Sequence, residues 1–201
     1  MITIGVVCRI DKTENNDVYV FNKKLCDYLI LENVRIIPLI NYDISLLKLC
    51  DGFILPGGDY ETIDFLVIKY AYEFDLSLLG ICMGMQSLGK YFNGNLELVD
   101  NHYSKSDYHF VNIDSSSKIF KILNRSKIKV NSRHKYKLSN TDLKISAYSQ
   151  DNVIEAIEMK NKKFVLGVQW HPEKDFKNNI DSKNIFLSFI NSARAYKNTA
   201  L

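Results

Sequence analysis

The sequence predicts an α/β protein with an open, mostly parallel sheet in three αβα layers and an antiparallel section added on one side. Two observations predict this. In the first half of the chain, apolar runs of strand length alternate with stretches whose apolar residues recur at helical spacing, an order typical of a parallel sheet covered on both faces. In the second half, five strand-like runs follow one another closely before a final helical stretch. A chain of 201 residues fits a single domain, 1–201, with a sizeable core.

The elements of the first half are placed by their apolar patterns and by the turn residues between them. The segment Pro56-Gly57-Gly58 stops the third strand, because proline cannot donate to a sheet ladder. The expected strands are 2–8, 35–39, 52–55 and 76–81, and the expected helices are 18–31, 44–49, 61–74 and 84–92.

The elements of the second half are shorter and closer together. The expected strands are 110–113, 128–131, 143–148, 153–159 and 164–169, with a hairpin turn at Asn161-Lys162 between the last two. A helix over 183–196 places Ile185, Phe186, Phe189 and Ile190 on one face, and we expect that face to belong to the core.

Composition excludes several classes of protein. The chain is 46% hydrophobic and 24% charged, and its net charge of +3 is too small to indicate a nucleic-acid partner. We expect no leader peptide and no membrane span. The four cysteines are scattered, with no Cys-x-x-Cys pair and no histidine at metal-ligand spacing to them. We therefore expect free thiols in a reducing cytoplasm, and neither a metal nor a cofactor.

Cys82 is the most informative residue, because Gly80 and Gly84 flank it two positions to either side, after an apolar strand. This pattern is the thiol form of a nucleophile elbow, a tight strand-to-helix turn that requires small residues at both flanking positions. The turn places the thiol at a helix N-terminus, where the helix dipole favours the thiolate. The plainer alternative is a buried structural cysteine beside two loop glycines.

Two further segments also follow strands of the predicted parallel sheet, and ligands bind beyond the carboxyl ends of such strands. His171 ends the last strand and is the candidate general base and acid. Glu173 could orient its imidazole, with Asp175 as a second possible carboxylate. The backbone N–H groups of Gly58 and Met83 are the candidate oxyanion donors. Each segment alone is a weak signal, since His-Pro and Pro-Gly-Gly are common in turns, but their combination indicates a Cys-His-Glu triad.

With these residues in place, the chain resembles class I glutamine amidotransferase-like domains, a flavodoxin-like fold, and within them the γ-glutamyl hydrolase branch, peptidase family C26. The resemblance covers nearly the whole chain, and it is carried by the segments 51–59, 80–86, 130–134, 154–158 and 167–173.

The resemblance implies Cys82, His171 and Glu173 as the triad of a γ-glutamyl amide hydrolase that forms a γ-glutamyl thioester and releases glutamate. It also implies that Gln86 and the segment 131–134 hold the α-amino and α-carboxylate groups of the γ-glutamyl moiety. The candidate substrate-binding residues are Arg9, Gly57, Gln86, Asn131, Ser132, Arg133 and His134.

The leaving group is suggested by a basic stretch that runs into this segment: Arg125, Lys127, Lys129, Arg133, Lys135 and Lys137. Strand alternation places these side chains on one face, where they are either a solvated surface or a rim that favours an anionic leaving group. In this respect the chain is similar to γ-glutamyl-CDP-amidate hydrolases of bacterial capsule phosphoramidate synthesis. γ-Glutamyl polyamine and aminobutyrate conjugates are the simpler substrates.

Two other functions stay open at this point. The chain could be a glutaminase subunit that supplies ammonia to a synthetase on a separate chain, and such a subunit would hydrolyse γ-glutamyl amides poorly alone. It could also be a non-catalytic binding or scaffold protein, in which the Cys82 thiol would be no more reactive than those of Cys8 or Cys26. A homodimer is possible under each of these functions.

Overall fold

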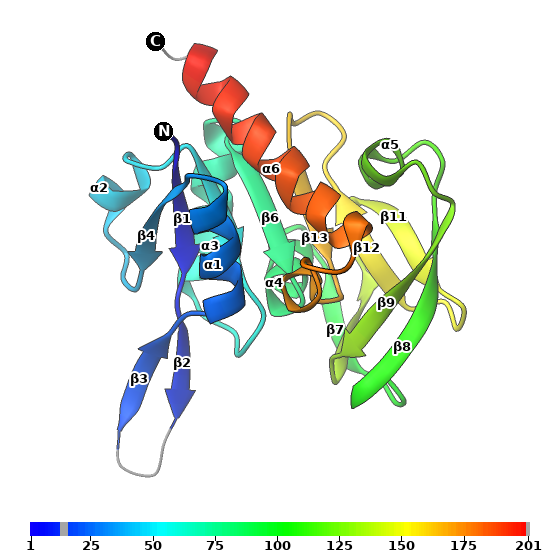
Figure 1. The fold of residues 1–201 in the computed structure, drawn as a ribbon. Coiled ribbons are helices and arrows are strands. Elements are labelled where there is room, and N and C mark those ends of the chain that lie inside the picture. Colours follow the sequence, from blue (N-terminus) through cyan, green and yellow to red (C-terminus); the bar gives the residue numbers. More distant parts are fainter. Residues whose placement is uncertain (13–15, 200–201) are drawn as a thin grey trace.

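The structure is a computed structural model that describes residues 1–12 and 16–199. Nine strands form one sheet in the order β4-β1-β5-β6-β13-β12-β11-β8-β9 (Figure 1). Neighbouring strands are parallel from β4 to β13 and antiparallel from β13 to β9. The predicted open sheet with an antiparallel section is therefore confirmed. The strands are β1 (Thr3–Val7), β4 (Arg35–Leu39), β5 (Gly52–Leu55), β6 (Ser77–Ile81), β8 (Tyr103–Ile113), β9 (Lys127–Arg133), β11 (Lys144–Ser149), β12 (Ile154–Glu158) and β13 (Val165–Val168).

Helices cover both faces of the sheet and bury two apolar clusters against it. Side-chain alternation along β5 shows the division, because Ile54 packs into one cluster while Phe53 and Leu55 pack into the other. The helices on the first face are α1 (Lys23–Leu31), α5 (Lys118–Leu123) and α6 (Ile180–Thr199), and those on the second are α2 (Ile44–Leu47), α3 (Ile63–Glu73) and α4 (Met83–Tyr91). Among the described residues, no helix combines the length and apolar character needed to cross a membrane.

The helix expected over 18–31 was wrong in its first part. Strand β3 (Asp17–Val20) pairs there with β2 (Arg9–Lys12) in an antiparallel ribbon beside the main sheet (Figure 1). Helix α1 begins only at Lys23, where the Asn22 side chain caps it by accepting from the backbone N–H groups of Lys24 and Leu25. All four residues of β3 are exposed, so the pattern of buried positions that the prediction relied on starts only after the cap.

Three short elements and part of a fourth were not predicted. Strand β8 begins at Tyr103 rather than near 110, and helix α5 follows it. Strands β7 (Asn95–Leu98) and β10 (Tyr136–Asn140) pair in a small sheet of their own. Most of their residues are exposed, so they lack the continuous apolar run that identified the other strands. The last hairpin was predicted correctly, since β12 and β13 are antiparallel neighbours.

Candidate active site

Cys82 occupies a strained turn between β6 and α4. Its backbone has φ 52° and ψ −106°, and it is the N-cap residue of α4. A positive φ is unfavourable for a residue with a side chain, so the surrounding fold must hold Cys82 in this conformation. The side chain is mostly buried, at 8% exposure, but it lines a cleft. This geometry is the nucleophile elbow that the sequence predicts.

The two flanking glycines are required by close backbone packing. A Cβ atom at Gly84 would lie 2.0 Å from the carbonyl oxygen of Leu55, and one at Gly80 would lie 2.7 Å from the carbonyl oxygen of Gly84. Neither position can accept a side chain without moving main-chain atoms. The glycines therefore let α4 start directly against β5 and β6.

His171 lies beside Cys82 at the carboxyl edge of the sheet. It follows β13, which pairs in parallel with β6. Both residues flank Gly57: a Cβ atom there would lie 2.6 Å from His171 Cε1 and 3.2 Å from Cys82 Cβ. The fold thus brings together two residues that are far apart in the sequence, and the absence of a side chain at Gly57 leaves room for the imidazole.

Glu173 orients the imidazole from a short 3₁₀ turn, Pro172–Lys174. His171 Nδ1 lies 2.7 Å from Glu173 Oε1, and both side chains are largely buried. Burial alone would lower the pKa of His171, but hydrogen bonds and charge interactions with Cys82 and Glu173 raise the pKa to about 9. Asp175 is engaged elsewhere, because its carboxylate accepts from Ser182 Oγ at 2.6 Å.

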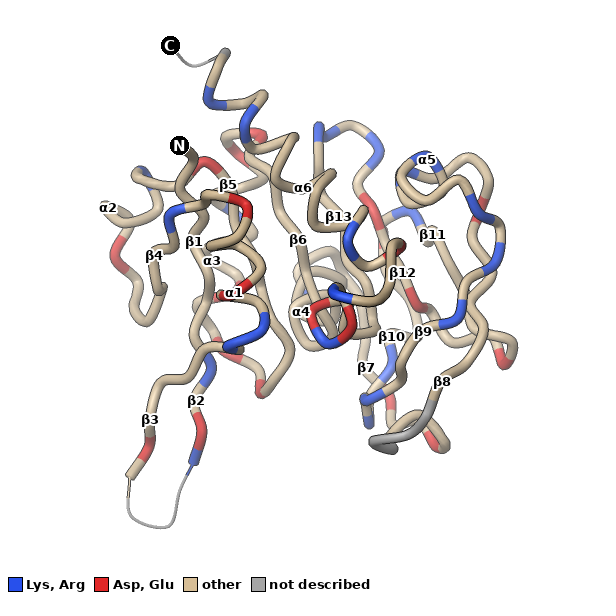
Figure 2. The backbone as a smooth tube through the Cα atoms, viewed as in Figure 1, with Lys and Arg blue, Asp and Glu red and all other residues tan. Residues whose placement is uncertain are grey.

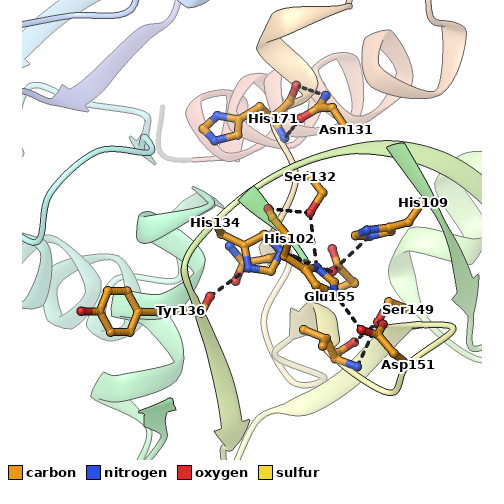
Figure 3. Close-up of polar contacts among 12 residues, drawn as sticks. His102, His109, Asn131, Ser132, His134, Tyr136, Ser149, Asp151, Glu155 and His171 are labelled. Atoms are coloured by element: carbon orange, nitrogen blue, oxygen red, sulfur yellow. Dashed lines mark hydrogen bonds and ion pairs between the residues drawn. The ribbon is translucent and has the colours of Figure 1, made fainter. Parts of the chain in front are cut away.

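Asn131 holds the main chain of His171 rather than facing the cleft. Its Nδ2 donates to the His171 carbonyl oxygen at 2.9 Å, and its Oδ1 accepts from the His171 N–H at 3.0 Å (Figure 3). Asn131 therefore has a structural partner in the His171 main chain, and its role in binding substrate stays a prediction. Its amide connects β9 to His171 through two hydrogen bonds.

The candidate oxyanion donors lie on either side of Cys82. Met83 is the first residue of α4, and helical geometry leaves its N–H without an acceptor inside the helix. Gly58 has φ 127°, a conformation that favours glycine. Its turn is supported by Arg9, whose guanidinium donates to the Pro56 carbonyl oxygen at 2.6 Å and forms a buried ion pair with Asp64 at 2.9 Å.

Arg9 has structural partners in the cleft, and its expected role in binding substrate stays a prediction. It lies at the predicted edge and lines a cleft, but its guanidinium is engaged by Asp64 and Pro56. Asp64 also accepts from Ser87 Oγ at 2.6 Å, so this network ties the Gly58 turn to both α3 and α4.

Two clefts meet at Gly58 and His171. One, of about 290 Å³, contains the Cys82 thiol. The other, of about 420 Å³, lies toward the β2–β3 ribbon. The further residues lining the first are Asp59, Met83, Gln86, Tyr103, Arg133, His134, Lys135 and Tyr136. Those lining the second include Arg9, Asp11, Asn22, Gly57, Glu173 and Lys174.

The predicted glutamate-binding residues divide between the cleft and the interior. Gln86, Arg133 and His134 line the cleft that contains Cys82. The Gln86 amide donates to the Tyr136 carbonyl oxygen at 2.8 Å, which holds it against the cleft wall. The Ser132 side chain is buried, since the residue is 1% exposed and its hydroxyl donates to the His102 carbonyl oxygen at 2.9 Å, and a contact of this residue with substrate stays a prediction.

The side chains of the basic stretch have several different surroundings, and Figure 2 shows where Lys and Arg lie along the backbone. Lys127 and Lys129 lie over the rings of Phe110 and Tyr108 on the outer strands, away from the residues that line the clefts. Arg133 and Lys135 line the cleft with Cys82. Arg125 pairs with Asp181, and Lys137 lies near Glu97. Of the stretch, it is therefore Arg133 and Lys135 that are placed to contact a substrate in that cleft.

Sequence reasoning missed several residues of the clefts. Asn22 and Lys174 were not singled out, although Asn22 donates to Glu173 Oε1 at 3.4 Å. Tyr103, on the strand that was predicted too short, also lines the cleft of Cys82. A recognisable helix cap at Asn22 was the one local signal that could have drawn attention to it.

Comparisons with known proteins show the family of this chain. The family model described as Peptidase C26 matches residues 59–173. The chain is 32% identical to a glutamine amidotransferase-like protein of Rickettsia prowazekii, over 75% of this chain and 79% of the relative. It is 30% identical to the γ-glutamyl-CDP-amidate hydrolase of Campylobacter jejuni, over 54% of this chain and 48% of that enzyme.

Solved structures show the same fold. A Thermoplasma acidophilum protein described as part of a GMP synthase superimposes with a TM-score of 0.74 at 22% identity, covering 100% of this chain and 98% of its own. The glutaminase domain of Trypanosoma brucei CTPS gives 0.73 at 19% identity, covering 97% of this chain and 94% of its own. These likenesses confirm the class I glutamine amidotransferase-like fold.

Proposed function

Because the chain belongs to the Peptidase C26 family of glutamine amidotransferase-like proteins, we propose that it hydrolyses a γ-glutamyl amide, with Cys82 as nucleophile and His171 and Glu173 completing a triad. The observation that carries this proposal is the convergence of Cys82 and His171 on Gly57, with His171 held 2.7 Å from Glu173. A scaffold protein would not need the strained backbone at Cys82 or this pairing.

The raised pKa of His171, about 9, favours the imidazolium at neutral pH, and the form of Cys82 that attacks is its thiolate. In acylation, the Cys82 sulfur attacks the γ-carbonyl carbon, and the oxyanion forms against the Gly58 and Met83 N–H groups. The C–N bond breaks as His171 gives its proton to the departing nitrogen, which leaves a γ-glutamyl thioester and a neutral imidazole. That imidazole then takes a proton from water, whose oxygen attacks the thioester and releases glutamate.

The cleft that contains Cys82 is the candidate γ-glutamyl pocket. Arg133 and Lys135 supply positive charge suited to the α-carboxylate, and the Gln86 amide lies one helical turn beyond Cys82. The second cleft, on the far side of His171, is then left for the departing group. Lys174 and Arg9 both line this cleft, and Arg9 is already paired with Asp64 whereas Lys174 is not.

For the leaving group we propose a nucleotide phosphoramidate, as in γ-glutamyl-CDP-amidate. Two observations support it: Lys174 in the second cleft and the 30% identity to the Campylobacter jejuni hydrolase. Glutamine itself, with ammonia passed to a separate synthetase chain, is the second candidate. It is supported by 34% identity to a Wolinella succinogenes GMP synthase over 61% of this chain and 24% of that protein.

A substrate panel tests the proposal. Purified protein is incubated with glutamine and with γ-glutamyl conjugates of aminobutyrate, putrescine and a cytidine phosphoramidate, and glutamate release is measured. We expect kcat/KM to be highest for the phosphoramidate. If glutamine is the best substrate, and only after a synthetase is added, the result would support the second candidate. If no substrate releases glutamate, the result would contradict the hydrolase assignment.

The pH profile should show the raised pKa of His171. Protonation of the leaving nitrogen requires the imidazolium, so kcat/KM should fall as pH rises through about 9 rather than near the ordinary histidine value of about 6.5. In Glu173→Gln, loss of the carboxylate should lower the pKa of His171 and move this alkaline limb to lower pH. An alkaline limb that stays in place in the variant would contradict the pairing.

Asn131→Ala should slow the chemistry rather than weaken binding. Loss of both hydrogen bonds to the His171 main chain should lower kcat by about 10–100-fold, because small displacements of a proton donor are costly, with KM little changed. Asn112→Ala, on the exposed face of the neighbouring strand β8, is the matched control. A rise in KM with unchanged kcat would instead indicate that Asn131 binds substrate.

A further inference from the structure

Three of the four histidines of this chain surround one buried glutamate (Figure 3). His102 precedes β8, His109 lies on β8, His134 follows β9, and Glu155 is the second residue of β12. His109 is 20% exposed, and the other three side chains are 3% exposed or less. The proposed hydrolysis uses none of these four residues.

The side chains converge on a single carboxylate oxygen. Glu155 Oε1 lies 3.2 Å from His109 Nε2, 3.6 Å from His134 Nε2 and 3.7 Å from His102 Nδ1. His102 Nδ1 and His134 Nε2 are themselves 3.1 Å apart. Among the described residues, neither Glu155 oxygen accepts a well-directed hydrogen bond, although both are enclosed. A buried carboxylate without such partners is costly unless a cation compensates it.

In His102 and His134, the outer ring nitrogen, which is the one farther from Glu155, already has a hydrogen-bond acceptor. His102 Nε2 lies 2.9 Å from Asp151 Oδ2, and His134 Nδ1 lies 2.9 Å from the Tyr136 carbonyl oxygen. These oxygens can only accept, so each neutral ring carries its proton on the outer nitrogen. The inner nitrogens then both present lone pairs, to each other and to Glu155. Carboxylate and carbonyl partners of this kind are typical of the outer shell of histidine–metal sites.

The separations also match a metal polyhedron. Ligands about 2.0–2.1 Å from a tetrahedral zinc ion lie about 3.3–3.4 Å from one another. Four of the six pairwise distances among these atoms, from 3.1 to 3.7 Å, bracket that value. One ligand atom each from His102, His109 and Glu155 fall within 4.8 Å of one another, and His134 joins this group of three through its distances to His102 and Glu155. We propose that His102, His109, His134 and Glu155 form a closed site for one Zn²⁺ ion.

The ion would join β8, β12 and the segment after β9, and so brace one wall of the active-site cleft. His134 lines that cleft. The Tyr136 carbonyl oxygen that accepts from His134 also accepts from Gln86 at 2.8 Å. Four protein ligands leave no open position, which indicates a structural rather than a catalytic ion. The expectation of no metal considered only histidines near cysteines, and these ligands come from positions 102 to 155.

Metal analysis tests the site independently of any hydrolytic activity. The full chain, expressed with zinc and freed of any affinity tag, is measured by mass spectrometry for metal bound per chain. We expect one zinc per chain. After removal with dipicolinate, a free Zn²⁺ concentration about a hundredfold above Kd should raise Tm by about 5–10 °C. Co²⁺ in its place should give the visible absorption of a tetrahedral ion.

Matched variants identify the ligands. His109→Gln, the most exposed ligand, and Glu155→Gln should lose stoichiometric zinc and the Tm response, whereas His171→Gln should keep both because His171 lies outside the cluster. If either ligand variant fails to fold, titration of the metal-free wild-type chain with Zn²⁺ still tests the site. Protein that stays metal-free with zinc supplied, without a Tm response, would overturn the site. A different ion at one per chain would overturn the choice of zinc.

Discussion

Cys82→Ser is expected to lower kcat for γ-glutamyl amide hydrolysis by at least about 10³-fold, while the fold and substrate affinity are retained. A serine hydroxyl is far harder to ionise than a thiol, so serine is the weaker nucleophile in this site. The measurement is steady-state kinetics with the best substrate of the panel, together with circular dichroism and substrate binding by calorimetry. Full activity in the variant would remove the nucleophile assignment.

The other cysteines provide the control. Cys26→Ser, on helix α1, should leave kcat unchanged. Burial raises the pKa of Cys8 to about 11 and that of Cys50 to about 12, so their thiols should react slowly with iodoacetamide at neutral pH. We expect one fast alkylation, mapped to Cys82 by mass spectrometry. Equal rates at Cys8 and Cys82 would favour the scaffold alternative.

Gly84→Ala is expected to cost at least about 3 kcal/mol of folding stability. The added methyl would lie 2.0 Å from the Leu55 carbonyl oxygen, so the start of α4 must move away from β5. That movement would also displace Cys82 and Met83, and hydrolysis should fall with stability. Urea unfolding at pH 7 measures the loss, and activity is assayed well below the unfolding temperature.

Gly89→Ala, in the same helix, separates this effect from a general effect of alanine. Its methyl would meet side-chain atoms of Leu138, with Cδ1 at 2.4 Å, whereas the methyl at position 84 would meet main-chain atoms of Leu55, which are harder to displace. Alanine is also the better helix former by about 1 kcal/mol. We therefore expect a much smaller loss than for Gly84→Ala. Equal losses would mean that the contact with Leu55 is not what requires glycine at position 84.

The elbow could be predicted from the sequence because its pattern is local. Gly80, Cys82 and Gly84 lie within five residues, and the contact that requires Gly80 lies within this turn, whereas the contact that requires Gly84 is with Leu55 on the neighbouring strand β5. The strands of the parallel half of the sheet could also be predicted from the sequence, since each buried strand forms a continuous apolar run. The ribbon of β2 and β3 was not, because its exposed residues carry no burial pattern.

The roles of residues 131–134 could not be read in the same way. They were treated as one binding segment, but successive side chains of a strand point to opposite faces. Asn131 contacts the His171 main chain and Arg133 lines the cleft, whereas Ser132 contacts His102, and His134 both contacts His102 and lines the cleft. Which face meets which neighbour depends on the register of β8 with β9, and a shift of one residue would exchange them.

By itself, the sequence determined the α/β order of the chain, the elbow at Cys82 and the ends of the strands that carry Gly58 and His171, because short-range sterics and periodicity control these features. Only the tertiary structure decided which side chains meet: His171 with Glu173 and Asn131, Arg9 with Asp64, and three distant histidines with Glu155. The physical reason is that such contacts depend on strand order and register across a nine-stranded sheet, which arise from the packing of the whole chain.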